Sequence, residues 1–180
     1  AESRGLRFAL LREDVAALAR REGLGLEECG RQVRYRFFHS LSPGEEDRIL
    51  TAHHAGDNAE TVLLHLCRGA SLPGLLGIPP RRGKVLRPFL RVSRREIEAY
   101  CRENGLAYVT DSSNLSGEYA RNRLRLEVLP VLEELNPGFL QAVSRMVETL
   151  RQDQDFLEAQ ARDLLEQVRL PWGLDGNRLA

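Results

Sequence analysis

The chain has 180 residues, 42% of them hydrophobic and 29% charged, and its 26 basic residues balance its 26 acidic ones. This length and composition are typical of one globular domain with a smaller unit attached, and the neutral charge removes any simple argument for strong nonspecific nucleic-acid binding. No run approaches the roughly 18 apolar residues of a membrane helix and no secretory signal is visible, so we expect a cytoplasmic protein without a membrane partner.

Short apolar runs alternate with amphipathic stretches through the first part of the chain. The predicted elements are, in order, a buried strand at Phe8–Leu11, a helix from Asp14 to Gly23, a helix at Glu27–His39, a buried strand at Ile49–Ala52 and a helix at Asp57–Arg68. A tight turn at His53–Gly56 joins the second strand to its helix. Repetition of strand and helix predicts a parallel sheet covered by helices.

Turn residues and one strong helix start organise the middle of the chain. The predicted elements are a loop at Leu72–Pro80, a turn at Arg81–Lys84, a helix from Ser93 to Gly105, a strand at Ala107–Val109 and a helix from Tyr119 with a kink or break at Pro130. Ser93-Arg94-Arg95-Glu96 has the spacing of a capping box. Asn136-Pro137 restarts the helix, and from Leu140 to Val168 apolar residues spaced by three and four predict one long helix or two packed ones.

We therefore predict an α/β fold: a Rossmann-like parallel sheet flanked by helices over residues 1–128, followed by an all-helical segment over residues 129–180. Up to Arg125 the chain carries 21 basic and 16 acidic residues, against 5 and 10 in the remainder. This asymmetry indicates a basic half that faces a polyanion and an acidic helical half. The three cysteines never form Cys-x-x-Cys, so we predict no metal site, no disulfide framework and buried thiols.

The turn before Asp57 follows a predicted parallel strand, and the carboxyl ends of such strands are where open α/β sheets bind ligands. Asp57 and Glu60 are three apart, so they could hold an ammonium group or, with a phosphate, a magnesium ion; the same spacing also fits a capping box. His53 and His54 are adjacent and cannot both point the same way, which argues against a metal pair.

Basic and polar residues elsewhere admit two interpretations each. Arg121 and Arg125 are four apart and form either a cationic fork for a carboxylate or phosphate, or a solvated helix face. A solvated face is also the alternative for Arg31 and Arg34. Two polar residues of a predicted loop, Asp111 and Asn114, fit either ligand contacts or simple Asx turns.

Four motifs in order resemble the signature of tRNA(Ile)-lysidine synthetases. They are HHAGDNAET at His53–Thr61, RPFL at Arg87–Leu90, DSSN at Asp111–Asn114 and YARNRLR at Tyr119–Arg125. The stretch from Leu26 to Tyr35 is similar to the segment that precedes that family's buried strand, so the resemblance covers roughly residues 8 to 140. It implies an ATP-pyrophosphatase (PP-loop) fold, ATP and Mg²⁺ as cofactors, free L-lysine and a tRNA(Ile) with a CAU anticodon as substrates, and a possible homodimer.

The implied reaction is adenylation of the C2 carbonyl of the wobble cytidine, followed by attack of the lysine amine and release of AMP. The resemblance implies a catalytic set of Asp57, Glu60, His53 and His54, with the two carboxylates holding the lysine and the two histidines near the nucleotide. The residues it places against the lysine carboxylate or the adenylate are Arg121, Arg125 and Asn122. Those it places against tRNA or phosphate are Arg31, Arg34, Arg87, Asp111 and Asn114.

The sequence departs from this family in one respect, because the family's Ser-Gly-Gly-x-Asp-Ser loop, which cradles the pyrophosphate of ATP, occurs nowhere in the 180 residues. We therefore expect the chain to be a piece that is inactive alone. Residues 1–128 would be the C-terminal portion of the PP-loop domain, and residues 129–180 a helical linker or the start of a tRNA-binding domain. The alternatives are a non-catalytic tRNA-binding module, which the missing loop favours, and a tRNA thiolase of the same superfamily, which the absence of Cys-x-x-Cys disfavours.

Overall fold

A computed structural model describes residues 5–108, 119–170 and 173–174 of the chain. The chain divides into two compact units. The first unit comprises Ala1–Leu50 and Arg82–Leu86, and the second unit comprises Thr51–Arg81 and Arg87–Ala180. Across the described ranges, no helix combines the length and the apolar character needed to cross a membrane.

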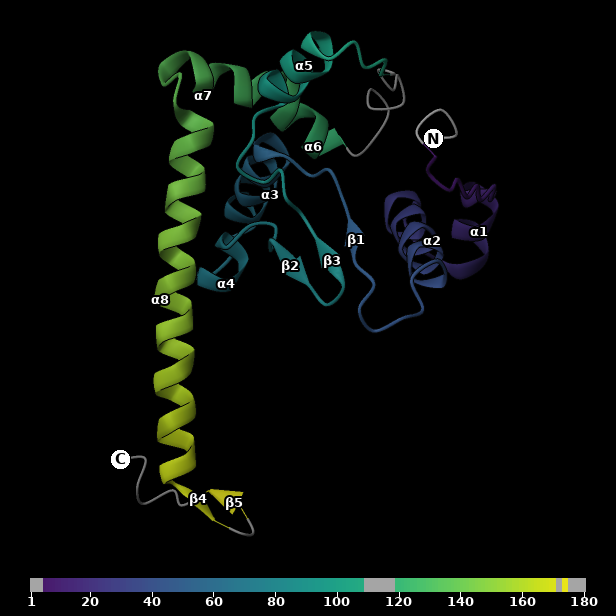
Figure 1. The fold of residues 1–180 in the computed structure, drawn as a ribbon. Helices are drawn as coiled ribbons and strands as arrows, with labels where there is room; N and C mark the ends of the chain where they lie inside the picture. The colour runs from purple at the N-terminus through teal and green to yellow at the C-terminus, as the bar shows by residue number, and fades with distance from the viewer. Residues whose placement is uncertain (1–4, 109–118, 171–172, 175–180) are drawn as a thin grey trace. The chain divides into compact units, whose positions relative to one another are not determined.

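Two helices form the core of the first unit. Helix α1 (Val15–Glu22) begins where the Asp14 carboxylate accepts the Ala17 N–H at 2.9 Å, and it ends at Gly23 with a φ of 66°. These bounds confirm the prediction. Helix α2 (Leu26–Ser40) packs beside α1, and their buried contact is formed by Leu18, Ala19 and Cys29 (Figure 1).

The strands are shorter than the sequence predicts. Strand β1 (Ile49–Leu50) pairs in parallel with β3 (Val85–Leu86), Ile49 opposite Val85, and β2 (Arg81–Arg82) completes a sheet of order β1-β3-β2. Gly83, with a φ of 57°, makes the predicted turn between β2 and β3. In the first unit the Lys84 ammonium donates to the carbonyls of Ser42 at 2.7 Å and Gly44 at 2.6 Å, which fixes the loop before β1.

Two predicted strands are wrong over the residues that the structure describes. Phe8–Leu11 is exposed, with Phe8 72% exposed, and no described strand pairs with it. Ala107 and Tyr108 are exposed and irregular, while Val109 lies outside the described residues. A strand is stabilised by hydrogen bonds to a neighbour, so an apolar run without a neighbour does not become one. The mixed α/β class is confirmed, with a small sheet in a mostly helical chain.

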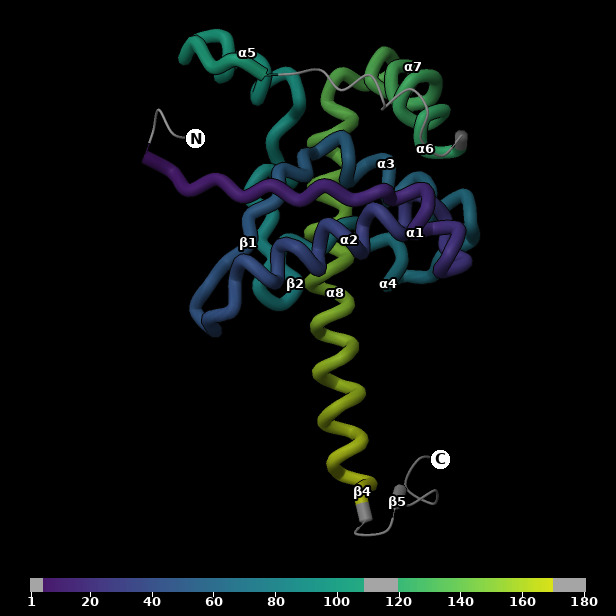
Figure 2. Tube along the Cα trace, turned by 90° about the vertical axis from the view of Figure 1, so that its right-hand side faces the viewer, coloured from purple at the N-terminus to yellow at the C-terminus, as the bar shows by residue number. Residues whose placement is uncertain are grey.

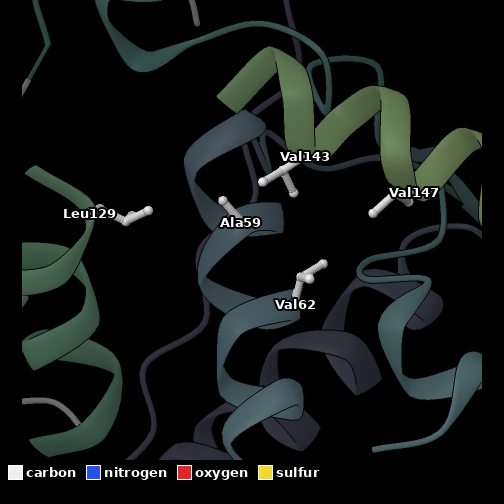
Figure 3. Close-up of a cluster of buried hydrophobic side chains, with 5 residues drawn as sticks. All are labelled: Ala59, Val62, Leu129, Val143 and Val147. Atoms are coloured by element: carbon white, nitrogen blue, oxygen red, sulfur yellow. The ribbon is translucent and has the colours of Figure 1, made fainter. Parts of the chain in front are cut away.

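The second unit is built around helix α3 (Ala55–Cys67). Its apolar side, Ala59 and Val62, packs against Val143 and Val147 of helix α8 (Phe139–Gln167) and against Leu129, as Figure 3 shows. The short helix α4 (Leu72–Leu75) lies within the predicted loop. Helix α8 is continuous for 29 residues, which selects the first of the two predicted alternatives, and its first half runs along α3 and α4 (Figures 1 and 2).

A second run of helix approaches α3 from the other side. It consists of α6 (Tyr119–Arg123), a π-helical segment η3 (Leu124–Val128) and α7 (Leu129–Leu135). The N–H of Leu129 donates to the carbonyl of Leu124, five residues back, and Pro130 has no N–H to donate. The predicted kink or break at Pro130 is therefore a widened turn just before the proline, and the helix continues through it.

Helix α5 (Arg94–Glu103) confirms the predicted capping box. The Glu96 N–H donates to Ser93 Oγ at 3.2 Å, and the Ser93 N–H donates to Glu96 Oε2 at 2.7 Å. Hydrogen bonds from the Ser93 side chain and backbone lower the pKa of Glu96. After α8, β4 (Arg169–Leu170) and β5 (Gly173–Leu174) form an antiparallel pair. The domain boundary expected at residue 128 stays a prediction.

Candidate functional site

His54 begins helix α3. Its Nδ1 accepts the N–H groups of Gly56 at 3.1 Å and Asp57 at 3.4 Å, and its own N–H donates to Asp57 Oδ2 at 2.9 Å. Because Nδ1 is an acceptor, the proton of the neutral ring lies on Nε2. A Cβ on Gly56 would lie 2.9 Å from the His54 ring, so this cap requires glycine. The capping box is thus His54–Asp57, and the alternative Asp57–Glu60 box is wrong because the helix starts two residues earlier.

Glu60 takes no part in the capping box and pairs with Arg125 instead. The Arg125 Nε donates to Glu60 Oε1 at 2.6 Å and its Nη2 donates to Oε2 at 2.9 Å. This is a bidentate ion pair, which is stronger than a hydrogen bond between neutral groups. Glu60 is only 2% exposed, whereas the Arg125 side chain is 28% exposed. The hydrogen bond that Arg125 donates to Glu60 raises the pKa of Arg125 above its ordinary value, so this guanidinium stays charged.

Asp57 shares the same guanidinium, with Arg125 Nη2 at 3.3 Å from its Oδ1. The Arg121 Nε lies 3.9 Å from Glu60 Oε2. The two predicted carboxylates and the two predicted arginines therefore meet in one cluster, which we call the Asp57–Glu60–Arg125 cluster. Two carboxylates face two guanidiniums in this cluster, so its formal charge is balanced.

The cluster opens onto a pocket in the second unit with a volume of about 800 Å³. One wall carries His54, Asp57 and Arg125. The start of α5 forms a second wall. The floor is apolar and is formed by residues of α7, of the start of α8 and of the segment that joins them. The remaining lining residues include the charged side chains of Arg94, Arg95, Glu98 and Glu133 and the apolar ones of Leu129, Pro130, Pro137 and Leu140.

Sequence reasoning missed the α5 wall of this pocket. Arg94 and Arg95 follow Ser93 at the first turn of α5, and Arg94 Nε donates to Glu98 at 2.7 Å. The capping box indicates where α5 starts but carries no sign that its first turn faces α3. Two adjacent arginines, separated from the RPFL motif by three residues, were the available signal.

Among the described residues of the second unit, His53, Arg87 and Asn122 do not line the pocket. His53 Nδ1 is 3.0 Å from Thr51 Oγ1. Arg87 is only 6% exposed and its Nη1 donates to the Pro79 carbonyl at 2.7 Å, so a role in fixing that loop accounts for it. Arg31 and Arg34 are exposed on α2 in the first unit. Asn122 lies on α6, and Asp111 and Asn114 lie outside the described residues. All assigned roles stay predictions.

Among residues 5–108, 119–170 and 173–174, no group of three or more His, Cys, Asp or Glu side chains could hold a metal ion. The cysteines are free; Cys29 is buried, Cys101 partly buried and Cys67 exposed, so the predicted burial is wrong for Cys67.

Comparison with known proteins places this geometry in context. Residues 2–132 match the model of the family described as PP-loop domain. The chain is 42% identical over 160 residues to the tRNA(Ile)-lysidine synthase of Geobacillus kaustophilus, covering 86% of this chain and 34% of that protein. It is 41% identical over 168 residues to that of Geobacter sulfurreducens, covering 92% and 36%. The chain thus spans about a third of the length of these curated relatives.

Proposed function

The chain belongs to the PP-loop domain family, and from this premise and the Asp57–Glu60–Arg125 cluster we propose that it takes part in ATP-dependent formation of lysidine in tRNA. Its similarity to tRNA(Ile)-lysidine synthases at about 40% identity supports this choice within the family. The observation that carries the proposal is that the cluster opens onto a pocket of about 800 Å³ with both charged and apolar walls. Such a pocket suits a zwitterion with an aliphatic chain.

The proposed reaction has two steps. ATP first transfers its AMP group to the C2 oxygen of the wobble cytidine, with release of pyrophosphate. The side-chain amine of free lysine then attacks C2, a C–N bond forms, the C2–O bond breaks, and AMP leaves. The amine must be held and must lose its proton before it can attack.

Asp57 is the carboxylate we assign to the lysine ammonium. Its side chain is 24% exposed and lines the pocket, and its link to Arg125 is the longer of the two carboxylate contacts, at 3.3 Å. The apolar floor at Leu129 and Leu140 lies where the methylene groups of lysine would pack.

Glu60 takes a different role in this proposal, because its carboxylate is only 2% exposed and both of its oxygens accept hydrogen bonds from Arg125. It is a positioning residue that holds Arg125 at the pocket wall. Arg125, with Arg94 and Arg95, provides positive charge for the lysine carboxylate or the adenylate phosphate.

ATP and Mg²⁺ belong to the proposal as cosubstrate and its counter-ion. The pocket arginines fit a phosphate, but the described chain offers no glycine-rich loop to cradle pyrophosphate, so no residue here is assigned to that task. The Mg²⁺ would travel with the ATP phosphates. We further propose the cytoplasm as its location and tRNA(Ile) with a CAU anticodon as its partner.

The test is incorporation of labelled lysine into a tRNA(Ile) transcript with a CAU anticodon. The chain is assayed alone and as a chimera in which it replaces its matching third of the Geobacillus kaustophilus relative, with ATP and Mg²⁺ present or omitted. We expect ATP-dependent incorporation by the chimera. Incorporation that is unchanged by Asp57→Asn would refute the role of Asp57, and a folded chimera that binds tRNA without any incorporation would favour the binding-module alternative.

A further inference from the structure

Helix α2 in the first unit has two different faces. Cys29 and Val33 lie on the face that packs against α1. Four residues spaced by three and four along the helix share the opposite face, because this spacing returns to the same side of an α-helix. They are Arg31, Arg34, Tyr35 and Phe38.

The side chains of this opposite face form an ordered column. The Arg31 Cζ lies 5.7 Å from the centroid of the Tyr35 ring, within the range of cation–π contacts. The Tyr35 and Phe38 ring centroids are 6.0 Å apart with an interplanar angle of 72°, an edge-to-face pair. Arg31 is exposed, so its planar guanidinium is the accessible end of the column.

Two arginines, Arg31 and Arg34, share this face of α2 with one glutamate, Glu27, so the formal charge of the face is positive. No ion pair between described residues involves Arg31, Arg34 or Arg36, although other arginines on exposed helices pair with a glutamate four residues later. Arg94 with Glu98, at 2.7 Å, is such a pair. The helix therefore presents a positive surface for an anion.

Charge and planarity together select a class of ligand. A free phosphate would use the arginines but not the aromatic rings. A nucleotide with an unpaired base offers both a phosphate and a flat face, and bases stack on aromatic rings and on guanidinium planes. A paired base in a duplex keeps its flat face inside the helix and offers only phosphates.

We propose that the Arg31–Tyr35–Phe38 column of α2 is a stacking site for an unpaired RNA base, with Arg34 contacting the neighbouring phosphate. The identity of the ligand as RNA rests on the proposed function. Tyr35 and Phe38 support the guanidinium plane from below, while Arg31 contacts the base directly.

The test measures binding of this chain to two fluorescein-labelled RNAs by anisotropy, without ATP or lysine. One is a hairpin with a single-stranded loop and the other is a fully paired duplex with the same number of phosphates. Arg31→Lys keeps the charge but removes the plane, so we expect its Kd for the hairpin to rise about 10-fold and its Kd for the duplex to stay unchanged. Arg36→Lys, off this face of the same helix, is the matched control and should change neither.

Two results would overturn the inference: an equal loss for hairpin and duplex, which would mean a contact by charge alone, or wild-type binding of the hairpin by Arg31→Lys. Absence of hairpin binding by the unaltered chain would overturn it as well. Tyr35→Leu should weaken hairpin binding and Tyr35→Phe should not; circular dichroism confirms that each variant folds. Lysine incorporation is measured separately, so its failure with hairpin preference retained counts against the proposed function alone.

Discussion

Replacement of Arg125 by methionine would leave the Glu60 carboxylate buried without its main partner. Glu60 is 2% exposed and receives two hydrogen bonds from Arg125, at 2.6 and 2.9 Å. Loss of one partner of a buried ion pair typically costs about 3–5 kcal/mol of unfolding free energy. Arg125 is itself 28% exposed and Arg121 lies within 3.9 Å of Glu60, so we expect the lower end, about 3 kcal/mol.

Urea unfolding followed by circular dichroism measures this free energy. The matched control is Arg123→Met on the neighbouring helix α6, where the Arg123–Glu127 pair is exposed at 72% and 59%; its loss should cost about 0.5 kcal/mol or less. The double variant Glu60→Leu/Arg125→Met removes both charges and should recover most of the loss. A cost below about 1 kcal/mol for Arg125→Met, or no recovery in the double variant, would refute the argument that a buried carboxylate needs this guanidinium.

Three further outcomes follow from local contacts. Asp14→Ala removes the acceptor at the start of α1 and should lower the unfolding free energy by about 1 kcal/mol in urea unfolding, whereas Asp14→Ser should retain most of it. Hydrogen bonds from Ser93 lower the pKa of Glu96, so the stabilisation of the folded state by Glu96 is present above the unfolded-state pKa and is lost as the pH falls through the folded-state pKa. Wild type should therefore be more stable than Glu96→Gln at neutral pH and should lose that advantage in acid. A stability difference that stays constant across pH would contradict this. Burial raises the pKa of the Cys29 thiol, so a maleimide should modify exposed Cys67 first and reach Cys29 only on unfolding, as read by mass spectrometry.

Helix ends could be predicted where the deciding contact is local. Asp14 bonds an N–H three residues away, and Ser93 and Glu96 bond each other across the same distance. His54 was missed as a cap because preferences for Ser, Thr, Asp and Asn point to Asp57 instead. Its ring reaches the N–H groups only because Gly56 leaves room for it.

Contacts between distant parts of the chain could not be predicted in the same way. The apolar run at Phe8–Leu11 satisfies the pattern of a buried strand, but whether it pairs depends on a neighbour that the pattern does not contain. Residue spacing identified Asp57 and Glu60 as one pair and Arg121 and Arg125 as another. It could not show that the two pairs neutralise each other, because that contact joins residues 65 positions apart.

The widened turn η3 makes the length of this stretch matter as much as its composition. On an α-helix four residues rotate by roughly 400°, so Arg121, Arg125 and Leu129 would drift around the axis by roughly 40° at each step. The π-helical turn takes back part of that rotation, and one side of the helix can deliver a guanidinium to Glu60 and a leucine to the core beside Ala59. Removal of a single residue between Leu124 and Val128 would restore regular winding and turn one of these contacts away. A substitution here therefore affects its own position, whereas a deletion changes how the two ends of the stretch are oriented relative to each other.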